Sequence, residues 1–115
     1  MSTNVRRYAV VNTTNNRVYL VSDLDDAKDK LQQIVELTTA MAENKYQKYV
    51  DYPNNRTYTY DILHNYDLNK THGVVGVVEH CEAYDKNLDS QCIIKPYNKF
   101  VETIRFRIME VCKLE

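Results

Sequence analysis

Two short apolar runs open the chain and are separated by four polar residues. Residues 7–12 and 17–22 are rich in β-branched and aromatic side chains, whereas residues 13–16 are Thr and Asn, which favour turns. This pattern predicts a β-hairpin. Apolar side chains occur on both faces of each run, so we expect at least part of the hairpin to be covered on two sides and the hairpin to lie inside a sheet.

A helical pattern follows the hairpin. Apolar residues recur at three- and four-residue steps and form one stripe that we expect to face the core: Leu24, Ala27, Leu31, Ile34, Val35, Thr38, Met41 and Ala42. Three aspartates within residues 23–26 suit the positive end of a helix dipole, and Pro53 stops the pattern. The sequence therefore predicts one long helix over about residues 23–50.

The second half of the chain contains three strand-like segments. Residues 57–64 alternate, and residues 74–83 form an apolar run in which Gly76 indicates a bulge or a close backbone approach. Residues 103–114 fit either a strand or an amphipathic helix that begins after Pro96. We favour the strand because a helix would expose Phe106.

These elements together predict an α+β fold. We expect an antiparallel sheet of four or five strands that starts with the N-terminal hairpin, with the long helix packed on one face. A chain of 115 residues has room for one domain, residues 1–115. Without an apolar run of roughly 18 residues or a signal-peptide core, no membrane is expected. Three widely spaced cysteines without a C-x-x-C pair favour a reducing, cytoplasmic or otherwise intracellular compartment.

Composition and spacing argue against an enzyme. The 15 basic and 16 acidic residues give a net charge of -1, so no overall field attracts nucleic acid or an anionic membrane. Two glycines, Gly73 and Gly76, leave no glycine-rich phosphate loop. The one adjacent pair of metal-ligand types, His80 and Cys81, would point to opposite faces of a strand. We therefore expect no catalytic residue, no metal and no cofactor.

Tyrosines are concentrated in the middle of the chain, where five of the ten fall within residues 46–60. At helical spacing, Tyr46, Tyr49 and Tyr52 would lie close together at the end of the long helix. Tyrosine is enriched at protein interfaces, although such rings also close the end of a core or stack on bases. The predicted partner-binding residues are Lys45, Tyr46, Lys48, Tyr49, Tyr52, Tyr58 and Tyr60.

These observations predict a small, non-enzymatic intracellular protein that binds a protein partner and forms a homodimer. The abundance of Asn, Tyr, Lys, Asp and Ile indicates an A/T-rich coding sequence, as in a virus or phage protein that acts on its host. The alternative is a nucleic-acid or nucleotide-binding module that uses the Tyr and Lys residues with Arg6, Arg7 and Arg17 of the hairpin. A hydrolase or nuclease is a third reading.

Overall fold

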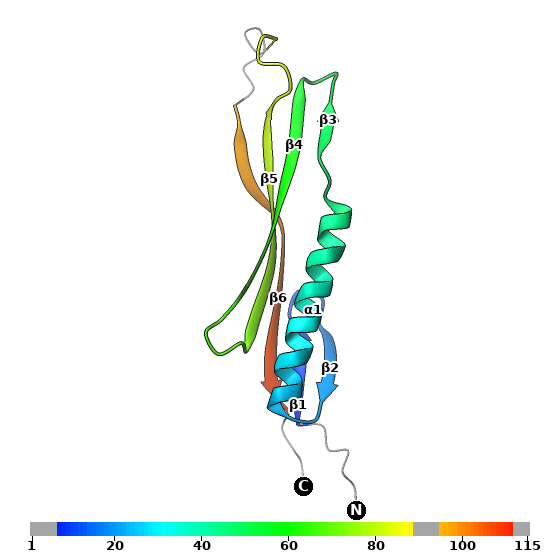
Figure 1. Cartoon of the computed structure of the whole chain (residues 1–115), viewed down its shortest axis with the longest axis vertical. Coiled ribbons are helices and arrows are strands. Elements are labelled where there is room, and N and C mark those ends of the chain that lie inside the picture. Colours follow the sequence, from blue (N-terminus) through cyan, green and yellow to red (C-terminus); the bar gives the residue numbers. More distant parts are fainter. Residues whose placement is uncertain (1–6, 89–94, 112–115) are drawn as a thin grey trace, which may run out of the picture.

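A computed structural model describes residues 7–88 and 95–111 of the chain (Figure 1). The elements are β1 (Tyr8–Asn12), β2 (Arg17–Val21), α1 (Leu24–Lys45), β3 (Tyr49–Asp51), β4 (Arg56–Tyr66), β5 (His72–Ala83) and β6 (Tyr97–Glu110). All pairs of neighbouring strands are antiparallel, in the order β2-β1-β6-β5-β4-β3. The molecule is elongated, with extents of 74 × 21 × 20 Å. The predicted α+β class is confirmed.

The sheet has six strands, more than the four or five expected. The additional strand is β3, whose three residues are too few to show alternation in the sequence. The C-terminal segment is a strand, as favoured, and the helical alternative is wrong. This strand begins at Tyr97 and not at residue 103, because Tyr97 pairs with Cys81 at the start of a long ladder with β5. An irregularity in that ladder at Val77/Val78 directly follows Gly76.

Helix α1 ends at Lys45, five residues before the predicted end. Its N-cap, Asp23, accepts a hydrogen bond from the backbone N–H of Asp26, and the N–H of Tyr46 donates to the carbonyl of Ala42 to close the last turn. Tyr49 and the residue after it have high strand propensity and pair with β4, so they form part of β3 and do not extend the helix. Tyr46, Tyr49 and Tyr52 therefore do not share a helical face.

The core lies between α1 and the lower half of the sheet. Buried residues from four elements form it: Val10, Ala27, Leu31, Ile34, Val35, Val75 and Phe106. The predicted stripe is correct at its centre, but Met41 and Leu24 are exposed, and Thr39, not Thr38, is buried. Thr39 donates its hydroxyl to the carbonyl of Val35 at 2.8 Å, which satisfies this polar group inside the core.

The N-terminal hairpin forms, but only β1 lies inside the sheet. Ala9 and Val10 of β1 are buried on opposite faces, as expected for part of the hairpin, whereas β2 is an edge strand on which Val18 and Leu20 are about half exposed. Arg7 and Arg17 do not form one basic patch, because Arg17 pairs with Asn12 while the N–H of Arg7 bonds to Val21 at the other end of the hairpin. Arg6 lies outside the described residues, as do Cys92 and Cys112.

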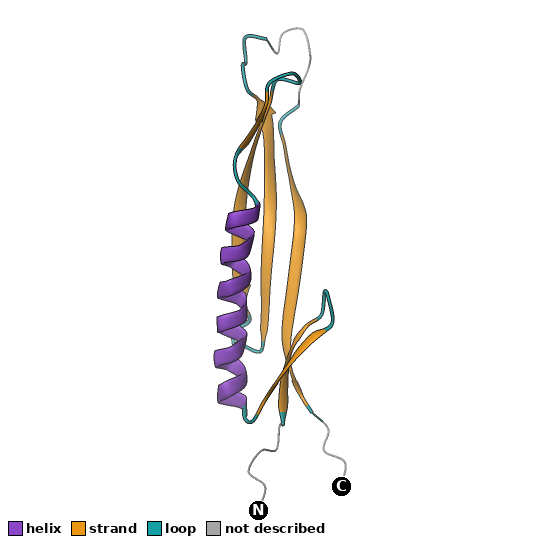
Figure 2. Ribbon diagram, turned by 90° about the vertical axis from the view of Figure 1, so that its right-hand side faces the viewer, coloured by secondary structure: helices purple, strands orange, loops and turns teal. Residues whose placement is uncertain are grey.

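The sheet continues past the end of the helix. Figure 2 shows α1 lying along the lower part of the sheet while strands extend well above its C-terminus. We call this extension the distal arm; it comprises β3, the first half of β4, the second half of β5 and the first half of β6. Within the described residues, no helix is long and apolar enough to cross a membrane.

Candidate protein-binding surface

The ladder of the distal arm places one row of side chains across four strands. Tyr49 pairs with Tyr58, Tyr58 with Cys81, and Cys81 with Tyr97. Side chains alternate along a strand, so Tyr58 and Tyr60 share the face of Ile62, which packs against the core below α1. Because α1 ends at Lys45, aromatic rings and not a helix lie over this part of the sheet. Between the flanking tyrosines, Cys81 is only 1% exposed.

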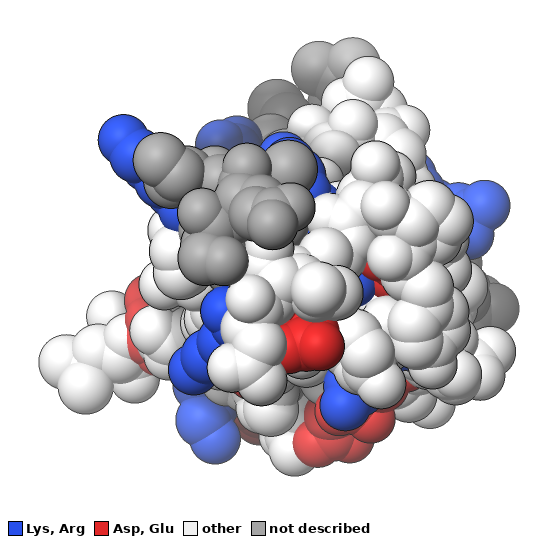
Figure 3. All heavy atoms as spheres, turned by 90° about the horizontal axis from the view of Figure 1, so that it is seen from above, with Lys and Arg blue, Asp and Glu red and all other residues white. Residues whose placement is uncertain are grey.

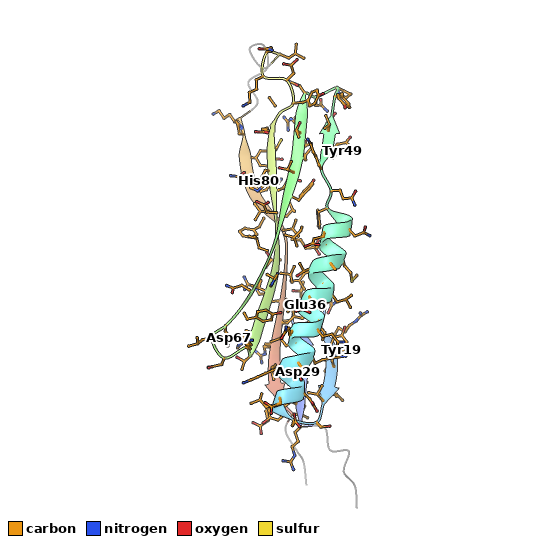
Figure 4. All side chains as sticks on the ribbon, viewed as in Figure 1. Tyr19, Asp29, Glu36, Tyr49, Asp67 and His80 are labelled. Atoms are coloured by element: carbon orange, nitrogen blue, oxygen red, sulfur yellow. The ribbon has the colours of Figure 1, made fainter. Side chains whose placement is uncertain are left out.

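Six tyrosines of this region form three ring pairs. Ring centroids are 5.3 Å apart for Tyr46–Tyr60, 6.0 Å for Tyr49–Tyr58, which stack, and 5.1 Å for Tyr52–Tyr84, which meet edge to face. Such pairs hold the rings in fixed positions. We call these six residues together with Tyr97 the tyrosine surface. Its outer rings are open to solvent, with exposed fractions of 58% for Tyr49, 68% for Tyr52 and 53% for Tyr84. Figure 4 labels Tyr49 on β3.

Two carboxylates bind the inner hydroxyls of the surface. Glu79 on β5 accepts from Tyr60 at 3.0 Å and from Tyr97 at 2.9 Å, and Glu102 on β6 accepts from Tyr46. Burial and the hydrogen bond to Glu79 raise the pKa of Tyr60 to about 12, and the hydrogen bond to Glu79 also raises the pKa of Tyr97. The hydrogen bond from Tyr46 lowers the pKa of Glu102. These hydroxyls therefore stay protonated at neutral pH.

Basic groups lie on the rings without gathering into one cluster. Lys45 lies 5.1 Å from the centroid of Tyr46 and forms an ion pair with Glu102 at 3.4 Å. Lys99 lies 5.2 Å from the centroid of Tyr97. A hydrogen bond to Tyr58 raises the pKa of Arg56. The two lysines make cation–π contacts and the arginine makes a hydrogen bond. All three contact the inner rings of the surface and not the most exposed ones.

The tertiary structure thus brings the predicted tyrosines into one region, although by strand pairing and not by helical spacing. Lys48 is exposed between α1 and β3. The sequence pattern missed Glu79 on β5, Tyr97 on β6 and Tyr84, which follows the end of β5 and packs against Tyr52. Their positions in the sequence carry no signal beyond residue type, because only the pairing of β5 with β4 and β6 brings Glu79 next to Tyr60 and Tyr97.

The histidines do not assemble a metal centre with the cysteine. His80 lies on the opposite face of β5 from Cys81, where its ring nitrogens contact Asn98 and, at 2.6 Å, Asp61. These hydrogen bonds raise the pKa of His80. Within residues 7–88 and 95–111, no three His, Cys, Asp or Glu side chains are placed to bind one metal ion.

Comparison of the chain with protein-family models, with curated proteins and with solved structures gives no match.

Proposed function

We propose that this protein acts by binding another protein through the tyrosine surface, as a non-enzymatic binding domain. One observation carries the proposal: three tyrosine ring pairs lie at and past the C-terminal end of α1, and Tyr49, Tyr52 and Tyr84 are each more than half exposed. Fixed tyrosine rings offer a partner apolar area and hydroxyl groups at a low cost in side-chain entropy.

Nucleic acid is the weaker candidate for this surface. Exposed rings near Lys45 and Lys99 favour stacking on bases, but Glu79 and Glu102 place two carboxylates among the rings, where they repel phosphate. Viewed down the long axis, Lys and Arg side chains are interspersed with Asp and Glu and with uncharged atoms (Figure 3). On the part of this end that the described residues form, the charges do not make a continuous basic strip along which a phosphate backbone could lie.

The proposal is tested by affinity capture from extracts of the source organism, followed by measurement with the purified partner. The protein and the double variant Tyr49→Ala/Tyr52→Ala are compared by calorimetry, because both rings are exposed and their removal spares the core. We expect the double variant to bind at least about tenfold more weakly, as truncation of interface tyrosines commonly does.

The matched control is Phe100→Ala, which removes an exposed ring from the opposite face of the same arm. Equal loss of binding in this control, or unchanged binding in the tyrosine variant, contradicts the proposal. Salt-sensitive binding of a single-stranded oligonucleotide that the tyrosine variant abolishes would favour the nucleic-acid candidate instead.

A further inference from the structure

A groove of about 650 Å³ runs between α1 and the sheet, below the tyrosine surface. This volume is in the range of sites that enclose a ligand. Leu37 and Met41 of α1, with exposed fractions of 60% and 65%, lie along one side. Ile104 and Phe106 of β6 line it from the sheet, and Tyr19 of β2 lines the far side. Figure 4 shows Tyr19 beside the lower half of α1. The groove is therefore mainly apolar.

Among the described residues, no strand pairs with one edge of β6 beside this groove. Residues 97–104 pair with β5, but on the other side β1 pairs with β6 only from Phe106 onward. Thr13 and Thr14 bond to the backbone of Arg105 and end that ladder. No other strand among the described residues continues β1 along β6. A free strand edge that faces a helix across an apolar groove is the geometry to which an extended peptide adds as a new strand.

The charged groups around the groove are mostly basic. They are Arg17, Lys30 and Lys45, with Glu102 as the one acidic residue that lines it. Glu102 already accepts from Tyr46 and Lys45. Lys30 lies 5.5 Å from the ring centroid of Tyr19, and within the described part of the chain neither Lys30 nor Arg17 pairs with a carboxylate. The groove therefore offers two cations to an acidic ligand.

We propose that the groove binds an extended acidic segment of a partner protein, which adds as a strand to the free edge of β6 in line with β1. Apolar side chains on the face of the segment that points into the groove pack against Leu37, Ile104 and Phe106, and carboxylates on the same face pair with Arg17 and Lys30. Of the residues that form the tyrosine surface, the groove shares only Tyr46, and the proposal stands whether or not that surface binds a protein.

The probe is a fluorescein-labelled seven-residue peptide that carries Glu, Glu, Ile and Val at its odd-numbered positions, which share one face of a strand, and Thr at the others, measured by fluorescence anisotropy at low ionic strength. Two matched peptides carry Lys in place of Glu, or backbone N-methyl groups that remove the strand donors. We expect the acidic peptide to bind at least about tenfold more tightly than either one. The double variant Arg17→Glu/Lys30→Glu should bind the acidic peptide at least about tenfold more weakly. Leu37→Asp, tested as a single variant, should also weaken binding of this peptide.

Two control variants separate this site from its surroundings. Lys28→Glu makes the same substitution as Lys30→Glu on a part of α1 that does not line the groove, and Tyr49→Ala alters the tyrosine surface alone; both should leave peptide binding unchanged. Equal binding of the Lys or N-methylated peptide, or no effect of the groove variants, overturns the proposal. It is also overturned if sedimentation shows a homodimer that excludes the peptide, because a second copy then occupies the edge.

Discussion

Tyr60 and Tyr97 donate their hydroxyls to the two oxygens of one carboxylate, that of Glu79, from the strands on either side of it. The arrangement joins β4, β5 and β6 in the distal arm, beyond the reach of α1. Hydrogen bonds to an ionised acceptor are stronger than those between neutral groups. The arm thus gains from side-chain hydrogen bonds some of the cohesion that helix packing supplies lower in the sheet.

Replacing Glu79 by Gln should lower the free energy of unfolding by about 1–2 kcal/mol, because the amide has one acceptor oxygen and no charge. Urea unfolding followed by circular dichroism measures this change. The control is Glu82→Gln on the same strand, where the exposed side chain lies on the other face. An equal loss in both variants would show that the bridge to the two tyrosines adds nothing.

The free energy of unfolding should fall at alkaline pH, because Tyr60 and Tyr97 then lose the protons that they donate to Glu79. The pKa of Tyr60 is raised in the folded state to about 12 from 10.0, and that of Tyr97 is also raised, so folding favours the protonated hydroxyls. This contribution is fully present below pH 10 and is lost as the pH rises through about 12. Absorbance titration of the tyrosines, together with unfolding measured across this range, tests the prediction. In the Glu79→Gln variant, Tyr60 and Tyr97 should ionise at lower pH than in the unmodified protein. An unchanged titration curve would contradict the role of Glu79 in raising their pKa values.

The β4–β5 turn should depend on an ionised Asp67. Its carboxylate accepts from the backbone N–H groups of Thr71 and His72 and from the Thr71 hydroxyl, which lowers the pKa of Asp67 to about 2. The stabilisation is present above the ordinary value of 3.8 and is lost as the pH falls toward 2. Asp67→Ala should therefore be less stable than the unmodified protein at pH 6 but similar to it at about pH 2.

The comparison is made by thermal unfolding at several pH values. A difference that persists unchanged at the lowest pH would mean that the substitution acts on the turn backbone and not through the carboxylate.

Gly73 and Gly76 should respond differently to Ala. A Cβ at Gly73 would lie 2.8 Å from Cγ2 of the buried Val35, so α1 must shift, and we expect a loss of about 1–3 kcal/mol. At Gly76 the nearest atom, at 3.1 Å, belongs to the Phe100 ring, which is 66% exposed and free to move. Gly76→Ala is therefore the matched control and should change stability little. Denaturant unfolding of both variants decides this, and equal destabilisation would contradict the close approach of α1 to Gly73.

The local elements were predictable where a single period dominates the sequence. The alternation in residues 57–64, the apolar run in residues 74–83 and the stripe through Leu31 and Val35 depend only on neighbours in the chain, and the predicted strands and helix appear in the structure. The preference for a strand around Phe106 is also correct, because burying that ring requires a period of two.

The remaining features of the fold depend on contacts between segments that are far apart in the sequence, and only the tertiary structure decided them. β3 and the early end of α1 exist because Tyr49 pairs with Tyr58, and helical spacing in residues 46–52 gave no sign of that pairing. Tyr97 and Glu79 meet across β5 and β6, and the free edge of β6 follows from where β1 stops. The sequence by itself determined the helix and the strands in which one period dominates, whereas long-range hydrogen bonds between strands decided which strands are neighbours and which surfaces stay open.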